Sequence, residues 1–278
     1  MGMTISIRMS SMVAGVAVAV LGAAAARADG DPKSMISTLV SHETSAADHR
    51  GYYMYVSEER SDRTGGHAWT ERVAETKWGK VHYLIAEDGK PLSAERVAAE
   101  KARVEGEGAD PEGFKKAESS RVDDEQHAKQ MLQLLPKAFL FDEPVNEGEL
   151  VKIGFKPNPE YSPNGMEEKV LHGMSGTVVV DAKTVRLREI DGRMPQDVSI
   201  GFGLLATIRA GSNFSTKREH VQGQDWKTEA LHTDINGKAI FLKTIARKQE
   251  SKHSEFKKLP EDITVKDAVA MLEKSSEL

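Results

Sequence analysis

Histidine offers this chain its widest range of chemistry, because the ring binds metals and transfers protons near neutral pH. The sequence has nine histidines, and no two follow the H-x-H, H-x-x-x-H or H-E-x-x-H spacing of zinc sites. His42, next to Glu43, precedes His49 by seven residues, which would put both rings on one side of a helix. Their serine and aspartate neighbours favour a solvated surface, so we expect no metal site.

A serine, a histidine and an aspartate also lie close together in the sequence, as Ser175, His172 and Asp181. The nucleophile elbow of hydrolases needs G-x-S-x-G at a turn from a strand into a helix. Here the serine stands in G-M-S-G and runs into a predicted strand at 177–180. The histidine, three residues earlier, would face the other side of a strand. We therefore expect a strand entry built from small residues, and no nucleophile.

Adjacent carboxylates occur repeatedly, but adjacent side chains diverge on a helix and face opposite ways on a strand. Examples are Glu58-Glu59, Asp123-Asp124 and Glu167-Glu168. A glycosidase takes its two acids from distant segments, and the sequence singles out no such pair. We expect no catalytic residue and no cofactor, and hence a protein that is not an enzyme.

The composition excludes several further classes of protein. The net charge is −5, with acidic and basic residues evenly mixed, whereas nucleic-acid-binding proteins usually show a basic stripe. We expect no nucleic-acid partner. The chain has no cysteine, which excludes disulfides, thiol catalysis, thiolate metal sites and a lipid-modified N-terminal cysteine. The core must therefore stabilise the fold without cross-links.

The N-terminus has the three parts of a secretory signal peptide. Arg8 supplies the positive start, 12–26 is an unbroken run of small and apolar residues, and Ala26-Arg27-Ala28 is an A-x-A cleavage site. We expect cleavage after Ala28, export to the periplasm or the exterior, and a soluble mature chain. No second apolar run approaches the roughly 20 residues of a spanning helix, so we expect no transmembrane segment.

The pattern of the N-terminal half predicts a helix, three strands and a helical insert. Residues 33–45 have apolar residues at helical spacing, and from Gly51 to the turn at Asp88-Gly89 the period changes to two. The segment at about 93–135 reads as two helices, with Ser93 capping the first and Asp110, before a proline, capping the second. The second helix is strongly charged until MLQLL, which predicts a solvated excursion whose end docks on the sheet.

From Lys137 onward the pattern predicts strands almost to the end. Asn236-Gly237 is the strongest hairpin signal in the chain, and a final helix at 265–273 is capped by Thr264. The predicted strands are 138–142, 149–156, 168–181, 184–190, 198–210, 213–221, 225–234 and 238–250. With the first three they give a meander of roughly ten or eleven strands.

One face of this predicted sheet is apolar and needs helices to cover it. We therefore predict an α+β fold in one domain, residues 29–278, with a large curved antiparallel sheet (a half-barrel) and helices packed on its concave side. The apolar face can be filled core, or it can leave a cavity for a lipid. The residues expected to line such a cavity are Val178, Leu187, Phe202, Leu204, Ile208 and Leu242.

Three segments carry a resemblance to a known family. They are VLHGMSGTVVVDAKTVRLREIDG (170–192), IGFGLLATIRAGSNF and GQDWKTEALHTDINGKAIFLKT. With the exported N-terminus and the helical insert, the chain resembles the lipoprotein-carrier superfamily (LolA/LolB-like and outer-membrane lipoprotein-sorting proteins), best over 170–256. The resemblance implies an open half-barrel that shields acyl chains in an apolar concavity, and it assigns no functional residue here.

Two functions follow as expectations. The first is a non-enzymatic periplasmic carrier or binder of a lipid-like ligand or of lipoprotein acyl chains. The alternative is a cell-envelope scaffold protein with a filled core, which would dock a protein partner through the charged segment 93–135. A hydrolase has no motif to support it.

Overall fold

A computed structural model describes residues 31–47, 49–200, 206–239 and 243–276. The predicted signal peptide lies outside the described residues, as do Phe202, Leu204 and Leu242. No helix in the described ranges is long and apolar enough to cross a membrane.

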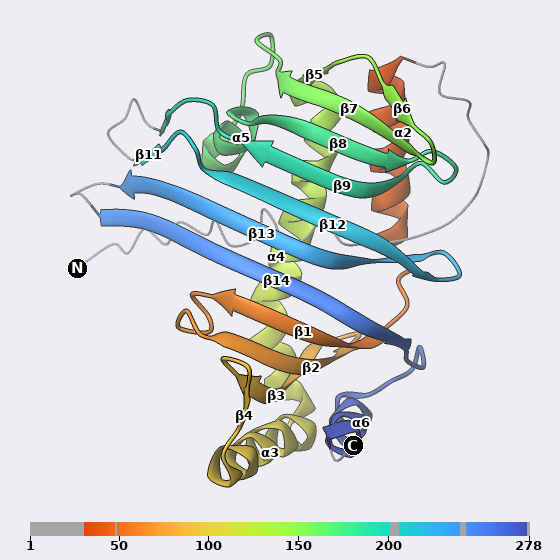
Figure 1. Ribbon diagram of the computed structural model, residues 1–278, viewed down its shortest axis with the longest axis vertical. Helices are drawn as coiled ribbons and strands as arrows, with labels where there is room; N and C mark the ends of the chain where they lie inside the picture. Colours follow the sequence, from red (N-terminus) through yellow and green to blue (C-terminus); the bar gives the residue numbers. More distant parts are fainter. Residues whose placement is uncertain (1–30, 48, 201–205, 240–242, 277–278) are drawn as a thin grey trace.

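The described chain forms an α+β fold with five helices and one open, curved antiparallel sheet of 14 strands (Figure 1). The helices are α2 (Pro32–Ala47), α3 (Ala94–Ala109), α4 (Pro111–Ala138), α5 (Gly165–His172) and α6 (Val265–Ser276). The strands are β1 (Tyr53–Ser61), β2 (Ala68–Thr76), β3 (Gly79–Glu87), β4 (Lys90–Pro91), β5 (Phe139–Phe141), β6 (Val145–Glu147), β7 (Leu150–Pro157), β8 (Ser175–Asp181), β9 (Arg186–Arg193), β10 (Val198–Ile200), β11 (Ala206–Ile208), β12 (Asn213–Gln222), β13 (Asp225–Ala239) and β14 (Lys243–Lys258).

The strand order joins the two ends of the chain at the centre of the sheet. It runs β4-β3-β2-β1-β14-β13-β12-β9-β8-β7-β5, while β6 pairs with β7, and β11 pairs with β10 and β13. The N-terminal hairpins therefore attach to the C-terminal strand β14. The sheet has more strands than the sequence predicts because short strands such as β4 and β6 are too brief to show a period of two.

The strongest predicted hairpin, at Asn236-Gly237, is wrong. A two-residue type I′ turn needs positive φ at both central residues, and Asp88-Gly89 has φ of 49° and 72°. Asn236 and Gly237 have no positive φ and lie inside β13, where they pair with β14 on one side and Gly237 pairs with β11 on the other. A Cβ on Gly237 would lie 2.6 Å from the Thr207 carbonyl oxygen, so this glycine permits close backbone approach.

The predicted strand at 168–181 is also wrong in its first part, because α5 covers 165–172. Glutamates in its first turn and a lysine and a histidine in its last turn suit the helix dipole. Likewise, the predicted strand at 198–210 is two short strands, β10 and β11, and the segment 201–205 between them lies outside the described residues.

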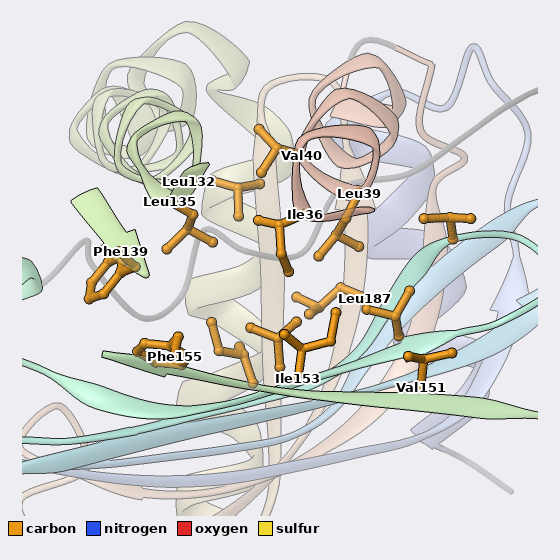
Figure 2. Packing of buried hydrophobic residues seen from close by; sticks show 14 of the residues in the cluster. Ile36, Leu39, Val40, Leu132, Leu135, Phe139, Val151, Ile153, Phe155 and Leu187 are labelled. Atoms are coloured by element: carbon orange, nitrogen blue, oxygen red, sulfur yellow. The ribbon is translucent and has the colours of Figure 1, made fainter. Parts of the chain in front are cut away.

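Helices pack on both faces of the sheet. On one face, Ile36 and Leu39 of α2 and Leu132 of α4 pack with apolar residues of β7, β8 and β9, including Ile153 and Leu187, in a first cluster (Figure 2). On the other face, Ala74, Val81 and Tyr83 pack against Val265, Ala268 and Leu272 of α6 in a second cluster. Since alternate residues of a strand face opposite sides, the remaining residues of β2 and β3 face α4.

Helix α4 is the element that spans the sheet. Its 28 residues extend about 42 Å at 1.5 Å per residue, and it runs across the strands behind the sheet in Figure 1. Phe114 near its start belongs to the second cluster, and Leu132 and Leu135 near its end belong to the first. The predicted docking of the MLQLL end is confirmed, but the rest of the helix is not a free excursion: its start is also docked, and its polar middle lies over the sheet centre.

Candidate functional site

A polar cavity of about 620 Å³ lies between the middle of α4 and the centre of the sheet. Strands β1, β2, β3, β12, β13 and β14 form its floor, and Arg121 and Glu125 of α4 form its roof. The lining residues are Arg50, Tyr55, Ser57, Glu59, Ser61, Asp62, Arg63, Glu75, Lys80, His82, Arg121, Glu125, Thr216, Lys227, Thr228, Leu231, Arg247, Lys248, Gln249, Ser251, His253 and Phe256.

The strand register explains why a hollow forms there. Ser57 of β1 pairs with His253 of β14 on one side and with Glu71 of β2 on the other, and Ser251 pairs with Glu59. Directly opposed residues share a face of the sheet. Short serine side chains at this point do not reach the helix, whereas longer apolar side chains of the first cluster fill the space under the C-terminal end of α4. The sheet centre is therefore polar and incompletely filled.

The cavity is enriched in positive charge. Seven lysines and arginines line it against four aspartates and glutamates, although the whole chain has a net charge of −5. A recess with an excess of one sign of charge raises the local concentration of ligands of the opposite sign. The composition of the whole chain conceals this local excess.

Ion pairs fix the charged groups on the roof and at one end of the cavity. Glu125 accepts hydrogen bonds from Arg50 Nη1 at 2.8 Å and from Arg121 Nη1 at 2.5 Å. Burial disfavours the charged carboxylate of Glu125, but Arg50 and Arg121 outweigh burial and hold its pKa below the ordinary value. At the floor, Lys227 Nζ lies 2.5 Å from Glu75 Oε2 and donates to the Gly51 carbonyl at 3.0 Å.

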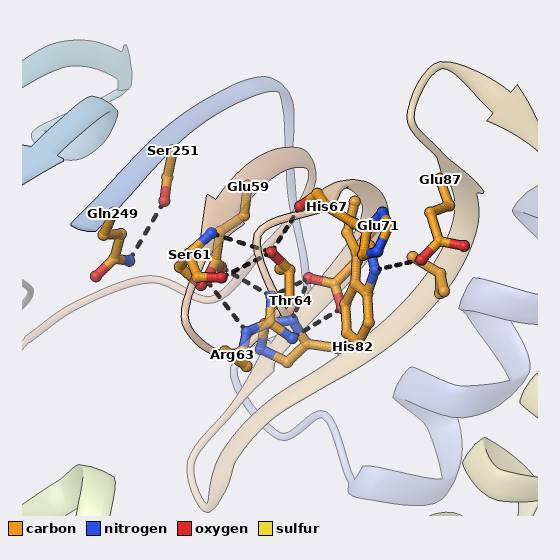
Figure 3. A network of polar contacts seen from close by, with 12 residues as sticks. Glu59, Ser61, Arg63, Thr64, His67, Glu71, His82, Glu87, Gln249 and Ser251 are labelled. Atoms are coloured by element: carbon orange, nitrogen blue, oxygen red, sulfur yellow. Dashed lines mark hydrogen bonds and ion pairs between the residues drawn. The ribbon is translucent and has the colours of Figure 1, made fainter. Parts of the chain in front are cut away.

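A second network closes the other end of the cavity (Figure 3). Arg63 donates to Glu59 Oε2 at 2.8 Å and to Glu71 Oε2 at 2.6 Å, and His82 Nδ1 lies 3.1 Å from the same Glu71 oxygen. Burial opposes the charged form of Glu71, but the hydrogen bonds from His82 and Arg63 lower its pKa to about 2. These groups are mutually satisfied and hold the loop after β1 against β2 and β3.

Lys80 stands apart from these pairs. The ammonium of Lys80 makes no hydrogen bond and no ion pair within 4 Å with a described residue. It lies over the Tyr55 ring, with Nζ 5.9 Å from the ring centroid. Burial lowers the pKa of Lys80, and the nearby charge of Arg121 lowers it further while Glu75 opposes the shift. The cavity thus contains a cationic side chain without a hydrogen-bonding partner in the described chain.

Three further polar groups that line the cavity lack one or all of their hydrogen-bond partners. Tyr55 is 4% exposed and Thr216 is 2% exposed, and the buried Thr216 hydroxyl has no hydrogen-bond partner among the described residues. His253 Nδ1 lies 3.0 Å from the Thr228 carbonyl, which can only accept, so Nδ1 carries the proton and Nε2 has a lone pair. Burial, with the charge of Lys80, lowers the pKa of His253 to about 4, so the ring is neutral at pH 7.

A second cavity of about 790 Å³ adjoins the first, between α3, α4 and β3. The two cavities share four basic residues, Arg63, Lys80, His82 and Arg121. The wall between them is therefore made of side chains that donate hydrogen bonds, and Lys80 borders both spaces.

The structure places the predicted apolar site residues away from this cavity. Val178 and Leu187 are buried in the first cluster with α2 and α4, and Ile208 is buried in a third cluster with residues of α5, β10, β11 and β13. All three are packed among other apolar side chains, and the other three predicted residues lie outside the described ranges. The described part of the sequence prediction therefore falls in packed core.

The structure does not bring the motif residues together as a site. His172 Nε2 contacts the Asn158 carbonyl at 2.9 Å, and Asp181 Oδ1 accepts from the Thr184 hydroxyl at 2.7 Å. His42 and His49 each place Nδ1 on a backbone carbonyl. Within the described ranges no group of three or more histidines and carboxylates could hold a metal ion.

Sequence reasoning missed the cavity residues, although β1 carried a signal for them. Tyr55, Ser57, Glu59 and Ser61 alternate with the residues of the opposite face, so one face of this strand is polar throughout. A polar face on a strand usually indicates solvent. Only the position of α4 across that face turns it into the floor of a cavity.

No protein-family model, no curated protein and no solved structure matches this chain.

Proposed function

We propose that this protein is a binding protein for a small anionic molecule, and that the ligand occupies the polar cavity beneath α4. One observation carries the proposal: the cavity has an excess of basic over acidic side chains, and the Lys80 ammonium within it has no hydrogen-bonding partner among the described residues. Lys80 is half-buried, and a cation that is partly removed from water costs free energy unless a counter-charge satisfies it. A ligand carboxylate or phosphate would supply that counter-charge.

The other groups of the cavity suit the rest of such a ligand. Tyr55 and Thr216 offer hydroxyl donors, and the neutral His253 ring offers an acceptor at Nε2. Arg121 uses Nε for Glu118 and Nη1 for Glu125, and its Nη2 makes no hydrogen bond with a described residue. A small molecule with one anionic end and hydroxyl or carbonyl groups would match this mixture of donors and one acceptor.

The test is calorimetric titration of the purified protein with a panel of carboxylates and phosphate monoesters. We expect saturable binding that weakens as salt rises, because the main attraction is between charges. Lys80→Met removes the charge and keeps most of the stem, and we expect it to weaken binding by roughly tenfold or more, corresponding to about 1.4 kcal/mol. Lys248→Met is the matched control, since Lys248 lines the same cavity but is 73% exposed and paired with Asp234 at 3.2 Å.

No binding by any anion of the panel, in a protein that is folded by circular dichroism, would overturn the proposal. Equal losses in the two variants would show a general charge effect, and would overturn the assignment to Lys80.

A second candidate function is the carrier that the resemblance implies, and the open, curved antiparallel sheet favours it. In this proposal the sheet is a half-barrel, α2 and α4 cover its concave side, and the protein is exported and carries a lipid-like ligand or acyl chains. Native mass spectrometry before and after solvent extraction separates the two candidates. A bound lipid mass that solvent removes supports the carrier, and an unchanged apo mass contradicts it.

A further inference from the structure

Lys80 differs from the other basic groups of the cavity in having no pairing partner. Arg50, Arg63, Arg121 and Lys227 each form an ion pair at 2.5–2.8 Å. In each pair the carboxylate favours the charged form of its basic partner. Lys80 is half-buried, and an unpaired amine that is partly removed from water is the kind that enzymes use as a nucleophile.

The surroundings of Lys80 shift its protonation equilibrium toward the neutral amine. Arg121 of α4 and Lys227 of β13 place positive charge around the same cavity, and burial is the largest influence that lowers its pKa. Glu75 is the main opposing charge, but it is already bound to Lys227 at 2.5 Å and to the Tyr53 backbone N–H at 3.0 Å. Tyr55 presents its ring to Lys80, and the neutral His253 ring lies 4.9 Å from the Tyr55 ring.

We propose that Lys80 captures carbonyl-bearing anions, such as 2-oxo acids or anionic aldehydes, by forming an imine inside the cavity. This inference rests on the proposed function and deepens it, because it names the chemical class of the ligand. The anionic end would be bound by Arg121, which borders both cavities with Lys80 and whose Nη2 makes no hydrogen bond with a described residue. The carbonyl carbon would then lie within reach of the amine.

The step balances without a further reagent. The neutral Nζ adds to the carbonyl carbon and forms the N–C bond. The two amine protons pass to the carbonyl oxygen, which leaves as water as the C–O bond is broken and the C=N bond is completed. Nothing is oxidised or reduced, and water reverses the step. Tyr55, whose ring centroid lies 5.9 Å from Lys80 Nζ, has a hydroxyl that would donate to the carbonyl oxygen.

The test traps the imine by reduction. Purified protein is incubated at pH 7 with glyoxylate, an anionic aldehyde, or with propionaldehyde, an uncharged one, in the presence of cyanoborohydride. The modified lysines are then located by peptide mass mapping. We expect the first glyoxylate adduct on Lys80, a much smaller yield there with propionaldehyde, and protection by oxalate, an anion that cannot form an imine.

Two variants distinguish the nucleophilic amine of Lys80 from its positive charge. Lys80→Arg keeps the positive charge but cannot form an imine, so we expect it to lose the first adduct. Lys248→Arg should retain that adduct. Peptide mapping of the unaltered protein gives the same information without any variant, so a folding defect in a variant does not prevent the test.

The outcomes distinguish the inference from the function on which it rests. Binding of oxalate with labelling spread evenly over surface lysines would overturn the imine and leave the anion-binding proposal intact. Preferred labelling of Lys80 by both aldehydes alike, without oxalate binding or protection, would overturn the anion site instead. Labelling that survives in Lys80→Arg would contradict the assignment to this residue.

Discussion

A buried carboxylate holds helix α2 to the sheet, and its removal should destabilise the whole fold. Glu43 of α2 is almost fully buried and accepts hydrogen bonds from Arg186 Nε at 2.7 Å and from the Leu187 backbone N–H at 2.9 Å. Arg218, which is also fully buried, donates to its other oxygen. We predict that Glu43→Gln lowers the free energy of unfolding by about 3–5 kcal/mol.

This magnitude follows from what the substitution leaves behind. Arg186 and Arg218 are buried, and Glu43 is the only carboxylate among the described groups that accept hydrogen bonds from their guanidinium groups. The amide of the variant would place N–H donors against one of these two guanidinium groups, which also donate. Breaking a buried pair by removing one partner costs more than the pair itself contributes, because the remaining charge stays uncompensated. The total stability of a domain is about 5–15 kcal/mol, so the loss is a large share of it.

Urea unfolding followed by tryptophan fluorescence measures the effect. Trp226 is a suitable reporter, since the guanidinium carbon of Arg186 lies 6.0 Å from the centroid of its ring. Glu105→Gln is the control, because Glu105 is exposed and its distance to Lys101 is 4.0 Å. We expect that control to change stability by less than about 0.5 kcal/mol.

The same residue gives a pH dependence with a defined sign. Burial opposes the charged form of Glu43, but Arg218 and Arg186 hold its pKa below the ordinary value. Its contribution to stability is therefore complete above the unfolded pKa of about 4.3 and is lost as pH falls through the folded pKa. Stability of Glu43→Gln should fall less steeply than that of the unaltered protein below about pH 4.3.

Two results would refute this reasoning. A loss below about 1 kcal/mol would show that the arginines find other compensation. Strict additivity of Glu43→Gln and Arg218→Met would show that the two side chains do not interact, whereas we expect the double variant to lose less than the sum.

Three further predictions concern single positions. Gly237→Ala should cost about 1–3 kcal/mol in urea unfolding, because its Cβ would lie 2.6 Å from the Thr207 carbonyl oxygen; an unchanged midpoint would contradict this close backbone approach. Charged Glu71 stabilises the fold fully above its unfolded pKa of about 4.3, and this stabilisation is lost as pH falls toward about 2. Glu71→Gln should therefore lose less stability in acid than the unaltered protein, and identical acid titrations of the two proteins would contradict this. Asp110→Ala removes the carboxylate that accepts from the Gly113 N–H at 3.0 Å and should cost about 1 kcal/mol by thermal unfolding, and Asp110→Asn, which keeps an acceptor, should cost less.

Local signals in the sequence predicted the ends of several elements correctly. Ser93 and Asp110 cap α3 and α4, and the Thr264 hydroxyl accepts from the Asp267 N–H at the start of α6. Asp88-Gly89 forms the predicted turn. These features depend on hydrogen bonds and φ angles within three or four residues, so the chemistry of a few neighbours is sufficient to fix them.

Part of the candidate site could also be anticipated from the sequence. The period of two in β1 places Tyr55, Ser57 and Glu59 on one face, and that face does line the cavity. The sequence could not distinguish a polar face in solvent from a polar face under a helix. The same limit misled the interpretation of α4, whose charged middle resembles a solvated helix but roofs the cavity.

The sequence by itself thus determined the caps, one turn, the antiparallel strand-rich character and the class of fold. The tertiary structure decided which strands meet, and with them the site. Pairing of β1 with β14 brings Ser57 beside His253, and folding of β13 beyond Asn236 overrides a local turn preference. The physical reason is range. Turn and cap energies act over a few residues, whereas the contacts that set Lys80 apart join segments far apart in sequence, and their energy exists only once the whole sheet has formed.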